Sequence, residues 1–164
     1  MRKVSPFLWF DKQAEEAVNF YVSLFPNAKI TKVSRYPSDA PGGNTEGAVM
    51  TVEFEIDGVN FVALNGGPDF KFNEAFSLTI DCDSQAEVDR YWKALTGNGG
   101  EEGPCGWCKD RYGLSWQVNP HRLGELMSDP DPKRAKAAMD AMLKQKKIVI
   151  AEIEAAADAV TEHA

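Results

Sequence analysis

The sequence contains no apolar run that approaches the roughly 20 residues of a membrane-spanning helix, so we expect no membrane span. Positive charge is also scarce, because 18 Lys and Arg stand against 25 Asp and Glu and leave a net charge of −7. A chain of this charge has no general attraction for nucleic acid or for anionic lipid. We therefore expect neither nucleic acid nor a membrane among its partners.

Cysteine is rare, with three residues, and this odd number does not fit a framework of disulfides. The start Met1-Arg2-Lys3 is basic, but no apolar signal-peptide core follows it, so we expect a cytoplasmic protein. Cys105 and Cys108 have the spacing of a redox or zinc pair. In a strand, however, residues three apart point to opposite faces, and zinc would need two further ligands. We expect no metal at this pair, and a redox role for either cysteine stays open.

A clear strand signal follows the turn at Gly113, where apolar and polar residues alternate as far as Asn119. The same alternation follows Gly58, and a shift of 55 residues places Gly58 on Gly113. A shift of 70 residues likewise places Leu8 on Leu78 within two apolar strands. We interpret the two halves as a duplication, each half with the order strand, helix and about three strands.

Helix and strand signals fill in the two halves. Strands are expected at residues 4–10, 28–36, 48–56, 59–65 and 76–80, and helices at residues 14–25 and 85–95. Asp11 and Ser84 are suited to cap these two helices, because their side-chain oxygens can accept bonds from the first free amides. The predicted fold is α+β, with two βαβββ modules in residues 1–120.

Residues 121–164 follow a different pattern, which predicts helices. Asp131 is suited to cap a helix that has Pro132 in its first turn, and residues 148–157 have a further aliphatic helix side. We expect a helical extension of the same domain. Its apolar stripes must cover either the sheet or a partner subunit, and the sequence leaves its role open.

The stretch Gly66–Asn73 cannot easily continue a strand and is predicted to be a loop with two phenylalanines, Phe70 and Phe72. Two interpretations are open. The rings can fold back onto the core, or they can form a lid over an apolar pocket.

Three stretches resemble one known family: Asn19–Pro26 (NFYVSLFP), Gly66–Asn73 (GGPDFKFN) and Trp107–Gln117 (WCKDRYGLSWQ). With them, the chain resembles the PhnB-like branch of the vicinal oxygen chelate superfamily, which also includes glyoxalase I, bleomycin resistance proteins and dioxygenases. Members of the branch often carry the label 3-demethylubiquinone-9 3-methyltransferase domain. The resemblance implies a cup-shaped mixed sheet built from two βαβββ modules, and a homodimer.

Metalloenzymes of that superfamily have a His on the first strand of each module and a Glu on the last strand. The resemblance implies that these positions fall on Pro6, Phe76 and Gln117. Pro and Phe cannot bind a metal, and a neutral Gln is a weak ligand for a divalent ion. A site for S-adenosylmethionine would need a Gly-rich turn in a parallel sheet, and we find none in the sequence. We therefore expect no metal and no cofactor.

The resemblance implies instead an apolar cup that binds a small molecule. We predict that eight residues line it: Leu8, Phe10, Phe70, Phe72, Phe76, Leu78, Ser115 and Gln117. The predicted function is a metabolite-binding protein that forms a homodimer. The alternative is a glyoxalase-type enzyme (a lyase, transferase or dioxygenase) that acts on a small metabolite, with Ser115, Gln117 or Cys105 as polar participants. Neither catalytic residues nor the identity of the ligand follow from the sequence.

Overall fold

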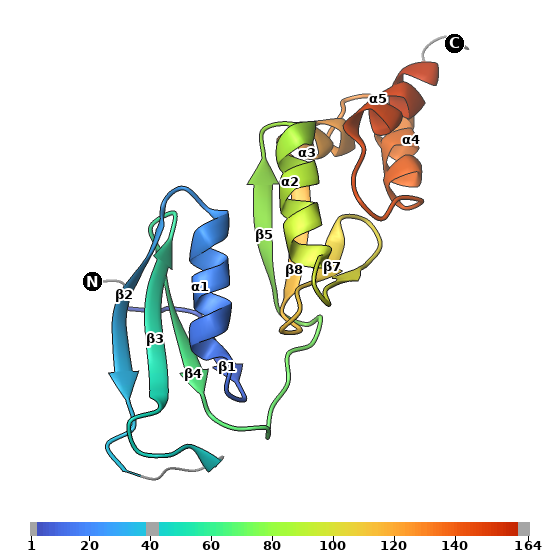
Figure 1. The fold of residues 1–164 in the computed structure, drawn as a ribbon. Helices are drawn as coiled ribbons and strands as arrows, with labels where there is room; N and C mark the ends of the chain where they lie inside the picture. Colours follow the sequence, from blue (N-terminus) through green and yellow to red (C-terminus); the bar gives the residue numbers. More distant parts are fainter. Residues whose placement is uncertain (1–2, 39–42, 161–164) are drawn as a thin grey trace. The chain divides into compact units, whose positions relative to one another are not determined.

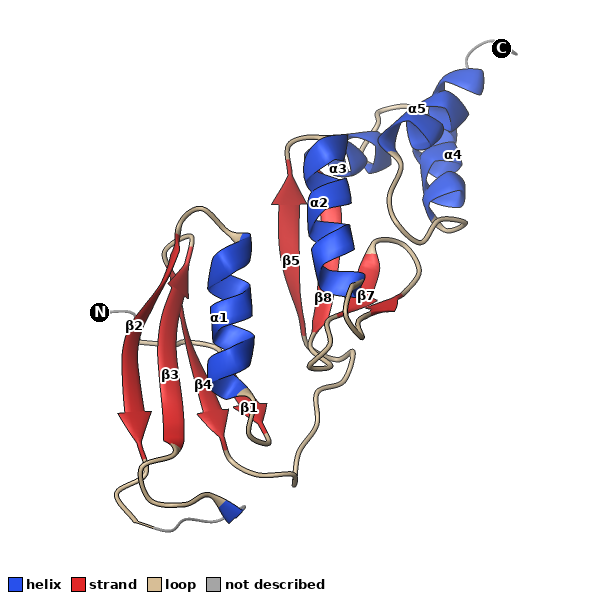
Figure 2. Cartoon of the chain, in the orientation of Figure 1, coloured by secondary structure: helices blue, strands red, loops and turns tan. Residues whose placement is uncertain are grey.

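The computed structural model describes residues 3–38 and 43–160. The chain divides into two compact units, Met1–Phe72 and Asn73–Ala164, and each is described by itself. Figure 1 follows the chain through both units, and Figure 2 separates their helices from their strands. None of the described helices is long and apolar enough to cross a membrane.

The first unit is a βαβββ module. Its elements are β1 (Phe7–Phe10), α1 (Ala14–Leu24), β2 (Ala28–Arg35), β3 (Val49–Ile56) and β4 (Val59–Asn65). The sheet has the order β1-β4-β3-β2, with β1 parallel to β4 and the other pairs antiparallel. Helix α1 covers one face of this sheet (Figure 1). On that face the centroids of the Tyr21 and Phe54 rings lie 6.4 Å apart.

The second unit repeats this topology, with its last three strands shorter than their counterparts. Its elements are β5 (Ser77–Cys82), α2 (Gln85–Thr96), β6 (Glu101–Glu102), β7 (Trp107–Lys109) and β8 (Ser115–Pro120). The order β5-β8-β7-β6, with β5 parallel to β8, matches the order of the first sheet strand for strand. The predicted duplication of a βαβββ module in an α+β fold is thus confirmed.

The two module helices begin differently from each other. At α2 the Ser84 hydroxyl accepts a hydrogen bond from the Glu87 amide at 3.3 Å, and the Glu87 carboxylate accepts one from the Asp83 amide at 2.9 Å. The Ser84 bond is the one expected of the predicted capping box, whereas the Glu87 carboxylate bonds the amide before the cap residue and not the amide of Ser84 itself. At α1 the predicted cap, Asp11, is wrong, because the helix begins later and the side chain of Asn65 accepts the Ala14 amide.

Three further helices complete the second unit: α3 (His121–Met127), α4 (Pro132–Met142) and α5 (Ile150–Ala159). The predicted cap at α4 is confirmed, since the Asp131 carboxylate accepts the Lys133 amide at 2.9 Å. The helices share a small core, formed by Leu123, Leu126, Ala138, Ile148, Ile153 and Ala157. Their apolar stripes therefore cover one another. Helix α3 is an element that the sequence pattern did not predict.

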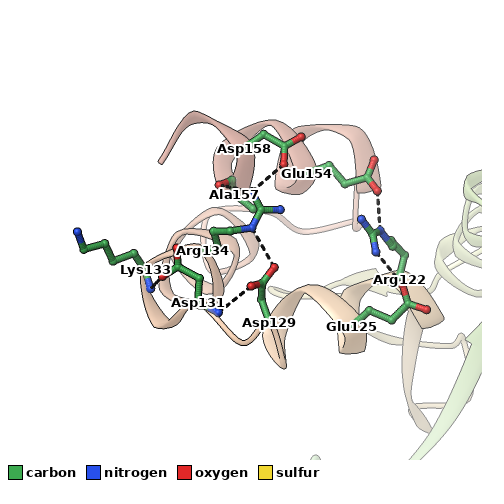
Figure 3. Close-up of polar contacts among 9 residues, drawn as sticks. All are labelled: Arg122, Glu125, Asp129, Asp131, Lys133, Arg134, Glu154, Ala157 and Asp158. Atoms are coloured by element: carbon green, nitrogen blue, oxygen red, sulfur yellow. Dashed lines mark hydrogen bonds and ion pairs between the residues drawn. The ribbon is translucent and has the colours of Figure 1, made fainter. Parts of the chain in front are cut away.

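Ion pairs of two arginines, Arg122 and Arg134, connect these helices at their polar surfaces (Figure 3). The Arg134 guanidinium lies 2.9 Å from a carboxylate oxygen of Asp129 and 2.9 Å from one of Asp158, and it donates to the Ala157 carbonyl. Arg122 bonds Glu154 in α5 in the same way. Arg134 has a largely buried side chain, so its planar fork fixes α4 against α5 with defined geometry.

Candidate functional site: a cavity on the second sheet

Strand alternation gives the second sheet one face covered by α2 and one open face. Trp116 and Val118 of β8 are buried on the helix-covered face, together with Cys108 of β7. The residues between them, Ser115 and Gln117, belong to the open face. Because paired residues share a face, Lys109 opposite Ser115 and Trp107 opposite Gln117 lie there too.

A cavity of about 160 Å³ lies at this face. It is lined by Glu74, Glu101, Glu102, Gly103, Pro104, Trp107, Cys108, Lys109 and Ser115. The lining residues come from β6, β7, the turn between them and the first residue of β8, and Glu74 precedes β5. The site is therefore built from the short strands of the second module.

Ser115 is one of the lining residues, and its hydroxyl is buried. The residue is only 1% exposed, and its Oγ has no hydrogen-bond partner among the described residues. A buried hydroxyl without a partner costs about 1–3 kcal/mol of stability. A ligand that exchanges a hydrogen bond with Ser115 would recover part of this cost.

Gln117 is held in place by its neighbours on the open face. Its Nε2 donates to the Ser77 hydroxyl at 3.0 Å, and its Oε1 accepts a longer bond, of 3.4 Å, from the side-chain Nδ2 of Asn119. Both ends of the Gln117 side chain are thus engaged. Gln117 organises the sheet surface next to the cavity and is not one of the residues that line it.

An ion pair forms one side of the cavity. The Lys109 ammonium lies 2.5 Å from a carboxylate oxygen of Glu74. The hydrogen bond from Lys109 lowers the pKa of Glu74, and the same bond raises the pKa of Lys109. Both residues are therefore charged at neutral pH. Glu101 pairs with Lys109 and shares its face, whereas the Glu102 carboxylate accepts the indole N–H of Trp92 in α2 at 2.9 Å and so belongs to the helix-covered face. On the open face two carboxylates, Glu74 and Glu101, therefore stand against one ammonium, so this side of the cavity is acidic.

The two spaced cysteines have different surroundings. Burial, with Asp110 and Glu102 nearby, raises the pKa of the Cys108 thiol to about 12, so this thiol stays protonated at neutral pH. Cys105 is half-buried and has a positive φ of 56°. Both thiols are free. Cys108 therefore contributes no thiolate for reaction at neutral pH.

The two predicted ligand residues of β1, Leu8 and Phe10, do not lie on the open face of the first sheet. Leu8 and Phe10 are 1% and 3% exposed, and Leu8 pairs with Ala63 on the face that α1 covers. The Phe72 ring packs on Phe10 at 5.1 Å, and Phe70 packs on Trp9 at 5.0 Å. The two loop rings therefore fold back onto β1. Strand alternation places Trp9, which lies between Leu8 and Phe10, on the open face instead.

Of the four predicted residues in the second unit, two lie on the open face, and Ser115 alone lines the cavity. Phe76 precedes β5 and is 45% exposed, while Leu78 pairs with Trp116 on the helix-covered face. Sequence reasoning missed Trp107 and Lys109. Their signal is present in the sequence, since both alternate with the buried Cys108.

Neither a metal nor S-adenosylmethionine fits these residues. Among residues 3–38 and 43–160, no group of three or more His, Cys, Asp or Glu side chains could hold a metal ion. The amide of Gln117 is already bonded to Ser77. The connections between the parallel-paired strands and their helices, Asp11–Gln13 and Asp83–Ser84, contain no glycine to approach a nucleotide, and both sheets are mixed.

Comparison with known proteins identifies the family. Residues 2–119 match the family model described as 3-demethylubiquinone-9 3-methyltransferase. The chain belongs to this family. A PhnB protein from Bacillus cereus with the same methyltransferase label is 34% identical, with a TM-score of 0.64 over 73% of this chain and 99% of that chain. The predicted PhnB-like family is thus confirmed.

More distant structures share the fold alone. Protein PA1353 from Pseudomonas aeruginosa is 20% identical, with a TM-score of 0.61 over 73% of this chain and 98% of that chain. A fosfomycin resistance protein, FosX, from Listeria monocytogenes, in complex with Mn(II) and a phosphonic acid, is 15% identical, with a TM-score of 0.50 over 73% of this chain and 93% of that chain. No curated protein matches the chain.

Proposed function

We propose that this PhnB-like protein binds a small uncharged or cationic molecule, without a metal, in the cavity on the open face of its second sheet. The buried Ser115 hydroxyl, which lacks a partner among the described residues and lies in the wall of this cavity, carries the proposal. Buried polar groups in proteins are nearly always hydrogen-bonded, and an exception in a cavity wall favours a bound partner.

The size of the cavity limits the ligand. An apolar cavity of about 150 Å³ can hold one benzene molecule. The cavity here, at about 160 Å³, therefore accepts one small ring or a short aliphatic group. A larger ligand would have to leave the rest of its structure outside. The Trp107 indole in the lining supplies a flat surface on which such a ring can stack.

The charge of the lining limits the ligand further. The carboxylates of Glu74 and Glu101 against the single ammonium of Lys109 repel anions and attract cations. The indole of Trp107 also attracts a cation through its π face. Phosphonates and carboxylates are therefore disfavoured ligands. Amines and neutral oxygenated molecules are favoured, with Ser115 as the hydrogen-bonding group.

Binding is favoured over covalent catalysis by the state of the one thiol in the lining. Because the Cys108 pKa is raised to about 12, this residue is a poor nucleophile at neutral pH. The glyoxalase-type enzyme remains the second candidate. It is tested by incubating each bound compound with the protein and analysing the mixture for products by mass spectrometry.

A thermal-shift screen tests the proposal, because a ligand that binds the folded state raises its unfolding temperature. The library contains matched amines, neutral analogues and carboxylates of ring size. We expect hits among the amines and the neutral analogues. Their dissociation constants should be about tenfold higher for Ser115→Ala, which lacks the hydroxyl. Ser34→Ala, a serine in β2 of the other unit, is the control. Hits that bind Ser115→Ala unchanged, or carboxylate hits alone, would contradict the proposal.

A further inference from the structure

Helices α3, α4 and α5 lie outside the family match, which ends at residue 119. The match to the Bacillus cereus relative uses 73% of this chain and covers 99% of the relative. The relative therefore folds without a counterpart of these three helices. Their shared core explains how they fold but not what they do. The contacts of the segment Gln145–Ile150, here called the docking segment, give them a role.

The docking segment bonds the turn that precedes β7. The Cys105 amide donates to the Gln145 carbonyl at 2.8 Å, and the Gly106 amide donates to the Lys146 carbonyl at 2.7 Å. Two consecutive amides of the turn are thus bonded by consecutive carbonyls of the segment. The Gly106 carbonyl in turn accepts the Val118 amide of β8 at 2.8 Å, so the turn is fixed between the segment and the sheet.

The docking segment is itself anchored to α2. The side-chain amide of Gln85 donates to the Ile148 carbonyl at 2.9 Å and accepts the Ile150 amide at 2.9 Å, as a neighbouring strand would. The Lys147 ammonium lies 2.6 Å from a carboxylate oxygen of Asp89, one helical turn further along α2. This anchor lies outside the cavity lining.

The turn held in this way is also one wall of the cavity. Gly103, Pro104 and Trp107 all line the cavity, and the turn that they form carries Cys105 and Gly106. Within the turn, the Trp107 amide donates to the Pro104 carbonyl at 3.0 Å, and the Gly103 amide donates to the Trp107 carbonyl at 2.8 Å. A displacement of the Cys105 and Gly106 backbone would therefore move the indole of Trp107.

We propose that the C-terminal helices position the ligand-binding cavity: the docking segment fixes the turn before β7 and so sets the place of Trp107. The part of this inference that concerns ligands rests on the function proposed above. Since coupling between two sites is reciprocal, a ligand that packs on Trp107 also protects the docking segment from local opening. Gln85 is a positioning residue in this arrangement.

The test uses the full-length chain with Gln85→Ala, which removes the two Gln85 bonds of the anchor and leaves every lining residue unchanged. Gln13→Ala, an exposed glutamine at the start of the other module helix, is the matched control. Backbone hydrogen exchange is followed by NMR, and 5-fluorotryptophan labelling reports on Trp107, whose signal is assigned with Trp107→Phe. Neither measurement requires a ligand.

We expect Gln85→Ala to speed exchange of the Cys105 and Gly106 amides about 10- to 100-fold and to shift or broaden the Trp107 fluorine signal. In Gln85→Ala the α1 amides should stay unchanged. In Gln13→Ala the Cys105, Gly106 and Trp107 signals should stay unchanged. Faster exchange in α5, with unchanged Cys105, Gly106 and Trp107 signals, would overturn the proposal. If Gln85→Ala does not fold, Asp89→Asn, which removes the Lys147 ion pair and alters the 3.1 Å contact of Asp89 with the Gln85 side-chain amide, is read in the same way with a smaller expected effect.

Compounds from the thermal-shift screen provide the last measurement. We expect their dissociation constants to rise about 3- to 10-fold in Gln85→Ala and to stay unchanged in Gln13→Ala. If no compound binds even the unmodified chain, the proposed function fails. The exchange and fluorine results still decide whether the helices position the turn, so the two failures are distinguishable.

Discussion

The side chain of Asn65 caps helix α1 from the end of β4: its Oδ1 accepts the Ala14 amide at 2.8 Å. The same side chain donates from Nδ2 to the Val49 carbonyl at 3.0 Å, at the start of β3. Its backbone carbonyl also accepts the Tyr36 hydroxyl at 2.6 Å. One buried residue thus connects the helix to the strands of the first module.

We expect Asn65→Ala to lower the free energy of unfolding by about 2–4 kcal/mol, because it leaves a buried amide and a buried carbonyl without partners. Urea denaturation measures this change. Asn60→Ala, an exposed asparagine in the same strand, should change stability by less than about 0.5 kcal/mol. Equal effects of the two substitutions would refute a capping role for Asn65.

Two glycines with similar backbone conformations provide a second test. Gly106 and Gly113 have φ of 81° and 87°, but an added Cβ would lie 3.0 Å from the Val118 carbonyl oxygen at Gly106 and would meet nothing within 4 Å at Gly113. We expect Gly113→Ala to cost about 1 kcal/mol through backbone strain and Gly106→Ala about 1–2 kcal/mol more through crowding. Equal losses in urea denaturation would show that the turn has room to move.

The pH dependence of stability should reflect Asp129. Its hydrogen bond from Arg134 lowers its pKa below the usual 3.8. A carboxyl group with a lowered folded-state pKa contributes stability above its unfolded-state pKa, and this contribution is lost as the pH falls through the lower folded-state value. Between pH 6 and pH 3, Asp129→Asn should therefore lose less stability than the unmodified chain.

The control for this measurement is Asp140→Asn, which alters the exposed pair of Asp140 with Lys136 on helix α4. Exposed pairs contribute little, so we expect it to follow the unmodified chain across the pH series. Thermal unfolding monitored by circular dichroism at each pH measures both variants. An acid response of Asp129→Asn identical to that of the unmodified chain would rule out the Arg134 contact as a source of pH dependence.

The buried cysteines should be unreactive while the protein is folded. Burial raises the pKa of both Cys82 and Cys108 to about 12 from a reference of 9.0. At pH 8 their thiolate fraction is then roughly a thousandfold below that of a free thiol. Titration with a disulfide reagent should show one fast thiol, Cys105, and two slow ones. Loss of the fast phase in Cys105→Ser is the check, and three equally fast thiols would contradict the expectation.

We also propose that the native unit is a homodimer. Phe7 and Phe70 of the first unit are 59% and 65% exposed, and large exposed aromatic side chains favour an interface. Two-fold pairing is the commonest assembly of soluble proteins. Light scattering at micromolar concentration should give a mass near twice the 18.1 kDa of one chain. A mass near 18.1 kDa would refute the dimer.

The sequence predicts the fold better than it predicts the site, for a physical reason. Apolar alternation in β8 and the capping box at Ser84 are local signals, and the structure contains both elements. The Asn65 cap depends on a contact with Ala14 across 51 residues, and no local pattern shows it. At β1 the run of apolar residues hides the alternation that separates Leu8 from Trp9, so the two faces could not be distinguished from composition.

The anchoring of the docking segment also bears on the order in which the chain folds during synthesis. The first module is complete once Gly67 has emerged from the ribosome, because its last parallel bond joins Gly67 to Asp11. Gln85 and Gly106, in contrast, wait for partners as late as Ile150. The turn exists only after Gly106 has been made, and the roughly 40 residues from there to the docking segment take about 2–8 s at about 5–20 residues per second. During that interval the turn before β7 lacks its partners in the docking segment. The nascent second module is therefore the part of the chain that chaperones would meet exposed.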